Sequence, residues 1–304
     1  MTSLFSPLPQ SLRIGVLRGG PSPEYEISLQ SGSFVLKNLS ETHKPIDIFI
    51  SRDGKWHVQG IERSPERILS HLDVLWNALY GQYGEDGKVQ EILKHHGVMY
   101  TGSDKFSSSV AMNKWITKER AILAGIKTPL AFIVRPDDSL FEKVKEIFQS
   151  IPHPLVVKPV NGRSSVGIHV VTSFKELLEA LENVLSQYPG ALVEEYISGK
   201  EACCTAIDNF RGQDIYTFPP SEKLSKVEND EVEYATKKIH QNLGLSHYSQ
   251  SDFIVSPRRG VYFLEVNTLP NISEKSKLSQ SLESVGVSIK EFLHHVIRLA
   301  LEGN

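Results

Sequence analysis

The sequence predicts an α/β protein built from more than one domain. Its 304 residues are too many for one small hydrophobic core and suit two or three domains that share interfaces. The content of 40% hydrophobic and 23% charged residues is that of an ordinary globular protein. Short apolar runs typical of strands alternate with helical patterns along most of the chain, which is the order that builds α/β sheets.

Composition also limits the classes of partner. The net charge of -3 offers no positive surface for nucleic acid or for an acidic membrane, so we expect neither as a partner. A phosphate-bearing ligand should therefore be small and held by local lysines. We expect no signal peptide in residues 1–10, which lack a basic flank and an apolar core, and no membrane span. Cys203 and Cys204 are expected to be packing groups in a strand, which fits the reducing cytoplasm.

The first hundred residues predict a parallel sheet with crossover helices. Strands are expected at 12–17, 45–50 and 73–79, and helices at 24–37 and 89–96. Gly19 and Gly20 follow the first strand directly, and the helix after them presents free N–H groups that can receive an anion. A tight turn alone would need the same glycines.

The loop at residues 78–87 joins the third of these strands to its helix. It contains three glycines around Glu85 and Asp86, and it leaves the carboxyl end of a strand, where open α/β sheets bind ligands. The same acids would also favour the positive end of the helix dipole. We expect both descriptions to hold.

A second unit begins near residue 105. Helices are expected at 113–124, 139–149 and 174–187, and strands at 129–134, 154–158 and 168–172. The loop at 158–167 matches neither of the common glycine-rich nucleotide-binding motifs. Its glycines and serines can fold over phosphates as a flap, with Lys158 at its base. A solvent-exposed hairpin is the alternative.

A third unit begins near residue 191 with a short apolar strand. Glu194 and Glu195 end this strand, and Glu201 opens the next one, so the three acids can line the wall of a cleft for adenine and ribose. An amphipathic helix is expected at 289–301.

The most informative stretch is a pair of expected strands in this unit. Residues 261–267 are apolar up to Glu265 and Asn267, which lie two apart and so share one face of a strand. The strand before it, at 247–255, contains Asp252, and the turn-rich loop between them predicts a hairpin that brings the three side chains together. Carboxylate and carboxamide oxygens are ligands for Mg²⁺, which takes its other ligands from phosphates and water. The alternative is that the acids are surface charges on a half-exposed sheet.

With these segments in order, the sequence resembles the D-alanine–D-alanine ligases of the ATP-grasp superfamily. The resemblance rests on four stretches: GGPSPEYEISL at 19–29, YGQYGEDG at 80–87, YTGS at 100–103 and LEVNTLP at 264–270. It implies a three-domain ATP-grasp fold. The implied domains are an N-terminal Rossmann-like parallel-sheet domain at 1–104, a central ATP-grasp subdomain at 105–190 and a C-terminal ATP-grasp subdomain with the metal site at 191–304.

The resemblance also implies roles for individual residues. Nucleotide binding is implied for the side chains of Lys114 and Lys158 on phosphate, Glu194 on the adenine amine and Glu201 on ribose, together with Ser165 and the backbones of Glu195 and Ile197. Two Mg²⁺ ions, with Mn²⁺ as an alternative, are implied at Asp252, Glu265 and Asn267. Catalytic or substrate contacts are implied at Glu24 on the substrate amine, Ser164 in the flap, Gln250 at the oxyanion and Ser276 on the terminal carboxylate.

The implied reaction explains these residue types. ATP converts the carboxylate of one D-alanine into an acylphosphate, and the amine of a second D-alanine attacks it to give D-alanyl-D-alanine for peptidoglycan synthesis. Lysines and metal ions neutralise charge on the phosphates. A tetrahedral oxyanion must be stabilised and water must be excluded. The resemblance alone implies a homodimer through the N-terminal domain.

The departures from the family concentrate at the oxyanion step. Gln250 stands where an arginine is usual, and losing one well-placed donor costs about a hundredfold or more in rate. Asn271 replaces the glycine after Pro270. Arg163 replaces a glycine of the flap, where it is expected either to contact phosphate or to stiffen the loop. Tyr80 stands where a histidine is usual.

The long loop that bears a Lys-Tyr pair in the family is not found after the prolines at 219–220. Only a short polar stretch at 221–226 precedes an expected helix at 229–243, and Lys223 or Lys226 is the candidate for the lost lysine. Two alternatives to the D-alanine–D-alanine ligase therefore stay open. One is an ATP-grasp ligase for another carboxylate and amine, and the other is a non-catalytic nucleotide-binding relative.

Overall fold

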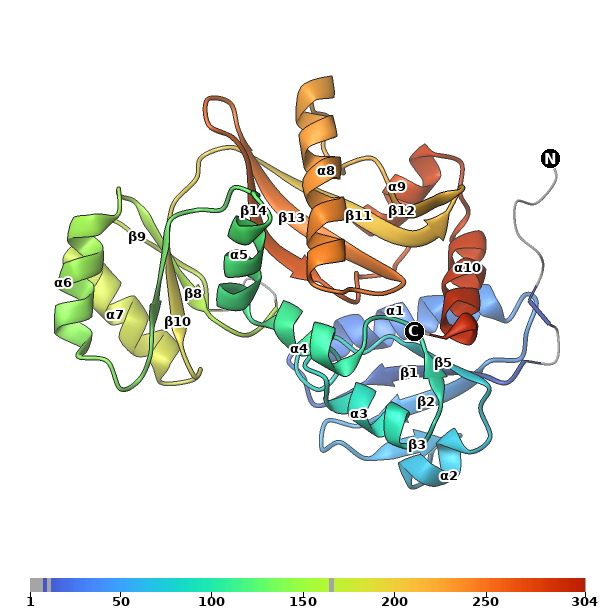
Figure 1. The fold of residues 1–304 in the computed structure, drawn as a ribbon. Coiled ribbons are helices and arrows are strands. Elements are labelled where there is room, and N and C mark those ends of the chain that lie inside the picture. The colour runs from blue at the N-terminus through green and yellow to red at the C-terminus, as the bar shows by residue number, and fades with distance from the viewer. Residues whose placement is uncertain (1–7, 10–11, 164–166, 304) are drawn as a thin grey trace.

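The computed structural model describes residues 8–9, 12–163 and 167–303, which fold into three α/β units with one sheet each (Figure 1). None of the helices in this part of the chain is long and apolar enough to cross a membrane.

The first unit is built on a six-stranded sheet in the order β4-β3-β2-β1-β5-β6. Its strands are β1 (Ile14–Gly19), β2 (Ile46–Ile50), β3 (Trp56–Val58), β4 (Ile61–Glu62), β5 (Val74–Asn77) and β6 (Met99–Tyr100), and its helices are α1 (Tyr25–Leu39), α2 (Pro65–Leu69) and α3 (Lys88–His95). The predicted parallel sheet is confirmed for β2, β1, β5 and β6, whereas β3 and β4 add an antiparallel edge. This edge was missed because strands of three and two residues carry no periodic signal.

The strand order of this sheet sets the position of its ligand-binding crevice. Strand β1 lies between β2 and β5, so the chain leaves it toward one side first and returns to the other side later. Open α/β sheets bind ligands at such a point, outside the carboxyl ends of the strands. Glu24 follows β1 and the loop at 78–87 follows β5, so both lie at this crevice.

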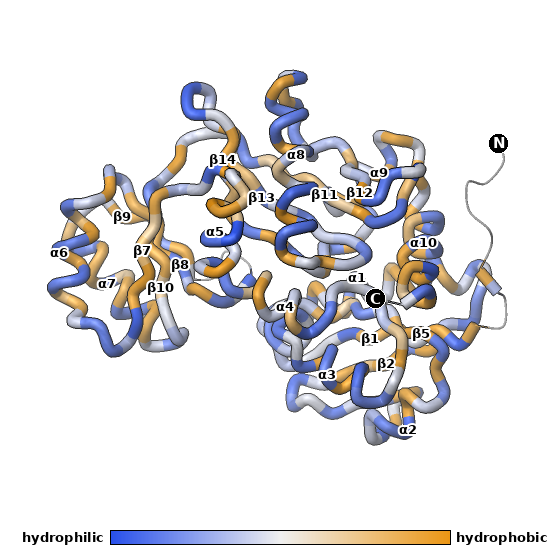
Figure 2. The backbone as a smooth tube through the Cα atoms, viewed as in Figure 1, coloured by the Kyte–Doolittle hydropathy of each residue, from blue (hydrophilic) through white to orange (hydrophobic). Residues whose placement is uncertain are grey.

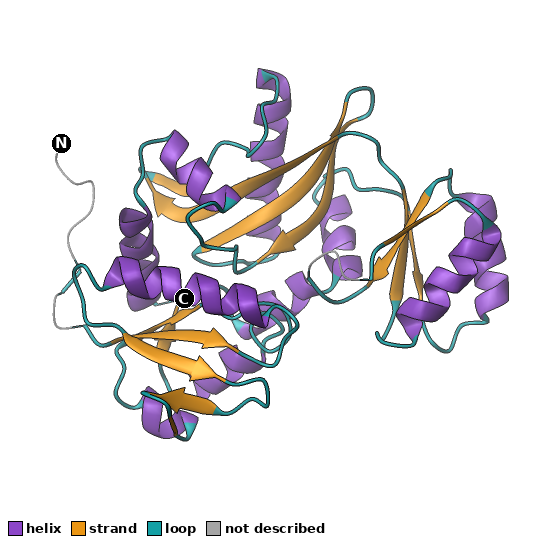
Figure 3. Ribbon diagram, turned by 180° about the vertical axis from the view of Figure 1, so that it is seen from behind, coloured by secondary structure: helices purple, strands orange, loops and turns teal. Residues whose placement is uncertain are grey.

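The second unit is a four-stranded antiparallel sheet in the order β7-β10-β8-β9. Its strands are β7 (Ala131–Val134), β8 (Leu155–Pro159), β9 (His169–Val171) and β10 (Ala191–Glu195), and its helices are α6 (Leu140–Ser150) and α7 (Phe174–Leu185). Helices α6 and α7 alternate between hydrophilic and hydrophobic residues (Figure 2), and their apolar faces share a core with β8 and β10. The helices that precede this sheet in the chain, α4 (Lys105–Met112) and α5 (Lys114–Leu123), pack on β14 of the third unit, and α5 stands between the two sheets (Figure 3).

The third unit is a four-stranded antiparallel sheet in the order β12-β11-β13-β14. Its strands are β11 (Lys200–Phe210), β12 (Gln213–Thr217), β13 (Tyr248–Ser256) and β14 (Gly260–Asn267), and its helices are α8 (Lys226–Asn242), α9 (Lys277–Ser284) and α10 (Ile289–Glu302). The predicted hairpin is present as β13 and β14.

Helix α10 packs against the first sheet and also contacts β11 and β13 of the third (Figure 1). Its Phe292, Leu293 and Val296 share one hydrophobic cluster with Ile14 and Trp76 of β1 and β5. The division at 1–104, 105–190 and 191–304 stays a prediction, and the last helix ties the first unit to the third.

Replacing Phe292 by alanine is expected to lower the free energy of unfolding by about 3–5 kcal/mol, because it opens a cavity in this shared cluster. The ring is fully buried and lies edge-on to Trp76 and Tyr248, with centroids 6.4 and 5.5 Å away. Urea unfolding measures the change. Phe106→Ala, at a position 70% exposed, is the control and should change the value by no more than about 0.5 kcal/mol. Equal effects in the two variants would contradict the packing assigned to α10.

Candidate functional site

A cavity of about 530 Å³ opens between the loop that follows β8 and the sheet of the third unit. Its walls come from β8, β11, β13, β14 and the segment that leads into α9. Six residues that the sequence analysis assigns to the site line it: Lys158, Glu201, Gln250, Asp252, Glu265 and Ser276. This cavity is the candidate site.

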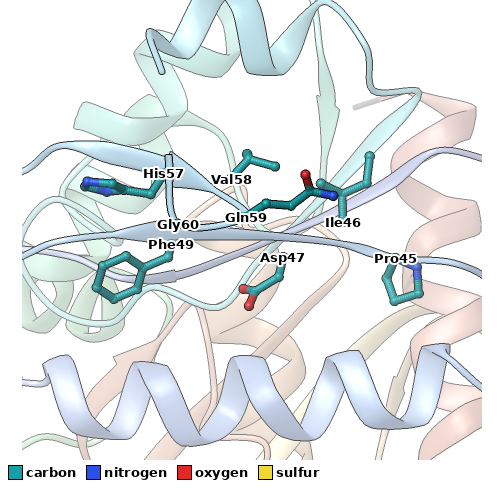
Figure 4. Close-up of a pocket in the computed structure, with 8 residues that line it drawn as sticks. All are labelled: Pro45, Ile46, Asp47, Phe49, His57, Val58, Gln59 and Gly60. Carbon is teal, nitrogen blue, oxygen red and sulfur yellow. The ribbon is translucent and has the colours of Figure 1, made fainter. Parts of the chain in front are cut away.

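A larger cavity of about 630 Å³ lies on the outer edge of the first sheet (Figure 4). Figure 4 shows its walls along β2 and β3, with side chains that include Asp47, Phe49 and His57. The Asp47 carboxylate is held in an ion pair with Arg18 at 2.6 Å. None of the residues assigned to the site lines this cavity.

The β13–β14 hairpin forms one wall of the candidate site. Asp252 is opposite Glu265 and Gln250 is opposite Asn267, so the four side chains share one face of the sheet. Asn267 Nδ2 donates to Asp252 Oδ2 (3.0 Å), and Gln250 Nε2 donates to Asp252 Oδ1 (3.3 Å). A bulge follows Asp252 and ends the regular pairing at the site.

The two carboxylates of the hairpin differ in their charge balance. Burial, and then the negative charge of Glu265, raises the pKa of Asp252 to about 7. Burial also opposes the ionisation of Glu265, but Lys114, Lys158 and Arg163 together outweigh it, so the pKa of Glu265 lies below its ordinary value. Lys114 Nζ lies 2.9 Å from Glu265 Oε2 and also donates to the carbonyl oxygen of Gly162. Lys114 therefore ties β14 to the loop after β8.

A buried ion triad holds the second predicted lysine. Lys158 Nζ lies 2.8 Å from Glu194 Oε2, and Lys118 Nζ lies 2.8 Å from Glu194 Oε1. Burial would raise the pKa of Glu194, but the two ammonium groups outweigh it and hold the pKa below the usual range. The sequence analysis gave Lys118 no role, although it follows Lys114 by one helical turn on the same face of α5. The triad fixes the Lys158 ammonium, and this side chain lines the cavity.

The other acidic residues of the predicted nucleotide wall have distinct environments. The Glu195 carboxylate accepts two hydrogen bonds from Arg259 (2.8 and 3.1 Å) and one from the Leu130 backbone N–H (3.0 Å), so this side chain is structural. Ile197 is buried beyond the end of β10. Glu201 lines the cavity from the start of β11.

Glu24 lies at the crevice of the first sheet and is not among the residues that line the cavity. Its carboxylate accepts a hydrogen bond from the Ser22 hydroxyl. A Cβ atom at Gly81 would lie 2.5 Å from Glu24 Oε2, and Gly81 has a φ of 67°. Only glycine therefore allows the loop after β5 to approach this carboxylate so closely.

Ser276 reaches the cavity as the N-cap residue of α9. Its Oγ accepts from the Ser279 backbone N–H (3.1 Å), the ordinary bond of a capping serine. Ser164 and Ser165 lie outside the described residues.

Two departures from the family contact one another at the site. The Arg163 guanidinium lies 4.8 Å from the centroid of the Tyr80 ring and pairs with Glu85 at 2.6 Å. The Tyr80 hydroxyl donates to the Pro270 carbonyl oxygen and accepts from the Ile272 backbone N–H, both at 3.3 Å. No local sequence signal connects these residues, because they come from three separate segments.

Two further lysines line the cavity from the segment that enters α9. They are Lys275 and Lys277, and within the described residues neither forms an ion pair. Lys223 and Lys226, the candidates named for the family's lost lysine, are exposed and do not line the cavity. Their position in the sequence suggested a lid, but Lys226 is already the first residue of α8.

The hairpin face offers the donor set of a hard cation. Asp252, Glu265 and Asn267 present carboxylate and carboxamide oxygens, and the strand register places the two carboxyl groups opposite one another. Residues 8–9, 12–163 and 167–303 contain no group of three or more His, Cys, Asp and Glu side chains suited to a metal. A cation here would take ligands from the carboxamide and from a bound phosphate. These residues fit Mg²⁺ in that role.

Two family models match most of the chain. The model of the D-ala D-ala ligase N-terminus matches residues 13–70, and the model of the D-ala D-ala ligase C-terminus matches residues 123–220 and 210–298.

Individual relatives are similar over nearly the whole chain. The D-alanine–D-alanine ligase of Fervidobacterium nodosum is 34% identical over 94% of this chain and 98% of its own length. The crystal structure of the Bacillus anthracis D-alanine–D-alanine ligase complexed with ATP has a TM-score of 0.81 and 27% identity, and covers 96% of this chain and 98% of that one. The VanG D-Ala:D-Ser ligase of Enterococcus faecalis has a TM-score of 0.85 and 27% identity, and covers 96% of this chain and all (100%) of that one.

Proposed function

The chain belongs to the D-alanine–D-alanine ligase family, and we propose that it joins two D-alanine molecules at the expense of ATP. The product is D-alanyl-D-alanine, a precursor of peptidoglycan. The observation that carries the proposal is the cavity in which the hairpin presents Asp252 and Glu265 beside the fixed ammonium of Lys158. Carboxylates and lysines in one cavity suit a reaction in which charge shifts on magnesium-bound phosphates.

The proposed reaction has two steps. In the first, a carboxylate oxygen of one D-alanine attacks the γ-phosphorus of ATP, and the bond from that phosphorus to the bridging oxygen breaks with its electrons leaving on ADP. In the second, the amine nitrogen of the other D-alanine attacks the acyl carbon of the acylphosphate. The nitrogen loses a proton, the bond between the acyl carbon and the phosphate oxygen breaks, and phosphate leaves with the electron pair.

We assign the nucleotide to the second and third units. Lys114 and Lys158 would hold the phosphates, and each is oriented by a carboxylate at 2.9 or 2.8 Å. Fixed cations stabilise charge that moves during phosphoryl transfer without reorganising. The remaining assignments are Ser165 with phosphate, Glu194 with the adenine amine, the backbones of Glu195 and Ile197 with adenine, and Glu201 with ribose.

We assign Asp252, Glu265 and Asn267 to two Mg²⁺ ions, with Mn²⁺ as an alternative. Bound ions would supply positive charge to the phosphates of ATP. The protein's contribution is the shared face of the hairpin, on which the amide of Asn267 already orients Asp252.

We assign the amino-acid substrates to residues around the same cavity. Glu24 would orient the substrate amine, Ser164 would lie over the reacting centre, and the Gln250 amide would donate near the oxyanion. Ser276 would meet the terminal carboxylate, with the ammonium of Lys277 beside it in the cavity wall.

Replacing Lys277 by methionine is expected to raise KM for D-alanine about tenfold, which corresponds to roughly 1.4 kcal/mol of binding, with little change in kcat. The reason is that this cavity-lining lysine, free of an ion pair in the part of the chain that the structure describes, can pair with a substrate carboxylate. Initial rates of ADP release across D-alanine concentrations measure the change. Lys223→Met is the matched control and should keep the wild-type KM. A larger rise in KM for Lys223→Met would instead assign the contact with the substrate carboxylate to the segment at 221–226.

The identity of the second substrate distinguishes the proposed ligase from its alternatives. Phosphate release with D-alanine alone, with D-alanine plus D-serine, and with other D-amino acids shows which amine is used. D-alanine alone is expected to suffice. Turnover only with another amine would support a different ligase, and Mg-ATP binding without turnover under any condition would support a non-catalytic relative.

We also propose that the protein is cytoplasmic, which the two buried free thiols support. The resemblance supports a homodimer. The dimer would form through the first unit. Light scattering on the eluting protein gives its molar mass and tests this directly.

A further inference from the structure

Arg163 lies where all three units meet. It belongs to the loop between β8 and β9 of the second unit, and its side chain is 16% exposed. Its Nη1 donates to Glu85 Oε2 (2.6 Å) of the first unit and to the Leu269 carbonyl oxygen (2.8 Å) of the third. The guanidinium also lies over the Tyr80 ring. From the sequence, two roles are expected for this arginine: it contacts phosphate or it stiffens the loop.

Glu85 is a fixed anchor for this arginine. Its carboxylate is buried and also accepts hydrogen bonds from the backbone N–H groups of Gly81 (2.9 Å) and Leu269 (3.0 Å), and from the Thr268 hydroxyl (3.3 Å). A carboxylate with this many donors has little freedom to move. The ion pair therefore sets the direction of the guanidinium as well as its position.

The anchored arginine keeps donors for something else. Both of its hydrogen bonds use Nη1, and no partner for Nε or Nη2 is found among the residues that the structure describes. Arg163 lines the cavity together with Gln250 and Asp252. The Gln250 amide already donates to Asp252, so this wall has one fixed guanidinium and one engaged amide.

The other cations at or near the cavity have different assignments. Lys114, beside the cavity, and Lys158, in its wall, are held by Glu265 and Glu194 and are assigned to the phosphates of ATP. Lys275 also lines the cavity and has no assigned role. Lys277 lies beside Ser276, at the end assigned to the terminal carboxylate. Arg163 lines the same cavity as Gln250, the residue assigned to the oxyanion, and as Asp252, to which the Gln250 amide donates.

We propose that Arg163 is a catalytic residue of the second step and supplies the cationic donors that Gln250 lacks. This inference rests on the proposed ligase function. As the amine nitrogen bonds to the acyl carbon, the carbonyl π electrons move onto oxygen, and the Nε and Nη2 groups donate to that oxygen. The charge returns to the carbonyl when the bond to phosphate breaks and phosphate leaves. Donors fixed before reaction stabilise such charge without a reorganisation cost.

Arg163 bonds to residues of the first and third units at once, so its side chain occupies the point where the three units meet. An occupied boundary helps to exclude water from the acylphosphate. Glu85 orients the arginine and also accepts hydrogen bonds from Gly81, Thr268 and Leu269, whereas Arg163 itself would touch the reacting atoms.

The test compares Arg163→Met with Glu85→Gln and Arg18→Met. Arg18 is the matched control, since it is 21% exposed, pairs with Asp47 at the same 2.6 Å and does not line the cavity. Arg163→Met is expected to lower kcat for dipeptide about a hundredfold to a thousandfold while the affinity for Mg-ATP stays close to wild type. Glu85→Gln should cost less and should raise the ratio of phosphate released to dipeptide formed. Arg18→Met should keep the wild-type kcat.

Two further variants guard against a purely structural explanation. Added guanidinium ion is expected to restore part of the kcat of Arg163→Gly. It would not do so if the arginine only held the three units together. The double variant Arg163→Gly with Gln250→Arg moves the cation to another position in the cavity wall. Its kcat is expected to exceed that of Arg163→Gly alone. An Arg163→Met enzyme that binds Mg-ATP and keeps kcat within threefold of wild type would overturn the inference. Wild-type protein that forms no dipeptide would instead overturn the proposed function on which it rests.

Discussion

Replacing Glu265 by glutamine is expected to lower kcat/KM for dipeptide formation roughly a thousandfold, about 4 kcal/mol of transition-state stabilisation. Glu265 lies opposite Asp252 on the hairpin face and is kept ionised by Lys114. A neutral amide would remove the carboxylate of this face whose pKa is lowered and which therefore stays ionised. Rates of ADP release across Mg²⁺ concentrations measure the loss. Asp47→Asn is the control carboxylate, taken from the larger cavity, and should leave the rates unchanged.

A second variant separates chemistry from folding. Glu265→Gln leaves the buried Lys114 without its carboxylate, which alone costs about 3–5 kcal/mol of stability. Asp252→Asn carries no such cost, because burial and Glu265 already disfavour the charge on Asp252. We expect it to lose activity to a similar degree while its free energy of unfolding at pH 8 stays equal to the wild type or rises. An Asp252→Asn enzyme within tenfold of wild type at saturating Mg²⁺ would contradict the assigned metal face.

Replacing Lys158 by methionine is the other change with a large expected effect. We expect kcat/KM for ATP to fall about a hundredfold to a thousandfold, because an oriented cation on the transferring phosphate is lost. Glu194 fixes this ammonium at 2.8 Å, and the side chain lines the cavity. Steady-state rates measure the loss in kcat/KM. Calorimetric titration with Mg-ATP shows how much of that loss is weaker binding.

Lys118 provides a control at the same carboxylate. It is equally buried and lies 2.8 Å from the other oxygen of Glu194, but it donates to the Pro129 carbonyl oxygen and does not line the cavity. Lys118→Met is expected to lower stability and to leave the affinity for Mg-ATP close to wild type. If both lysine variants lost ATP affinity equally, the triad would be acting as one unit and Lys158 would have no special contact with phosphate.

Local pattern was enough to predict the parts of the site that lie on adjacent strands. The alternation of polar and apolar residues placed Glu265 and Asn267 on one face, and the turn between the strands placed Asp252 beside them. The parallel core of the first sheet followed from the alternation of strands and helices. These features depend on residues close in the sequence.

The parts that the sequence could not predict depend on contacts between distant segments. Strand β10 inserts between β7 and β8, and this order alone brings Glu194 to Lys158. Arg163 and Glu85 are 78 residues apart and meet only when the three units assemble. Periodicity within a segment carries no information about contacts between residues far apart in the sequence. Lys277 could not be predicted for a related reason. It belongs to no sequence motif, and only the folded structure shows that it lines the cavity.

The measurement that tests the central claim most directly follows the carboxylate oxygen of D-alanine. The protein is incubated with Mg-ATP and D-alanine labelled with ¹⁸O in its carboxylate, and the dipeptide and the released phosphate are analysed by mass. An acylphosphate route requires that each phosphate released with a dipeptide carries one oxygen from D-alanine. We expect ¹⁸O in the phosphate and an equal amount of D-alanyl-D-alanine. Unlabelled phosphate, or phosphate released without dipeptide, would contradict the ligase reaction assigned to this cavity.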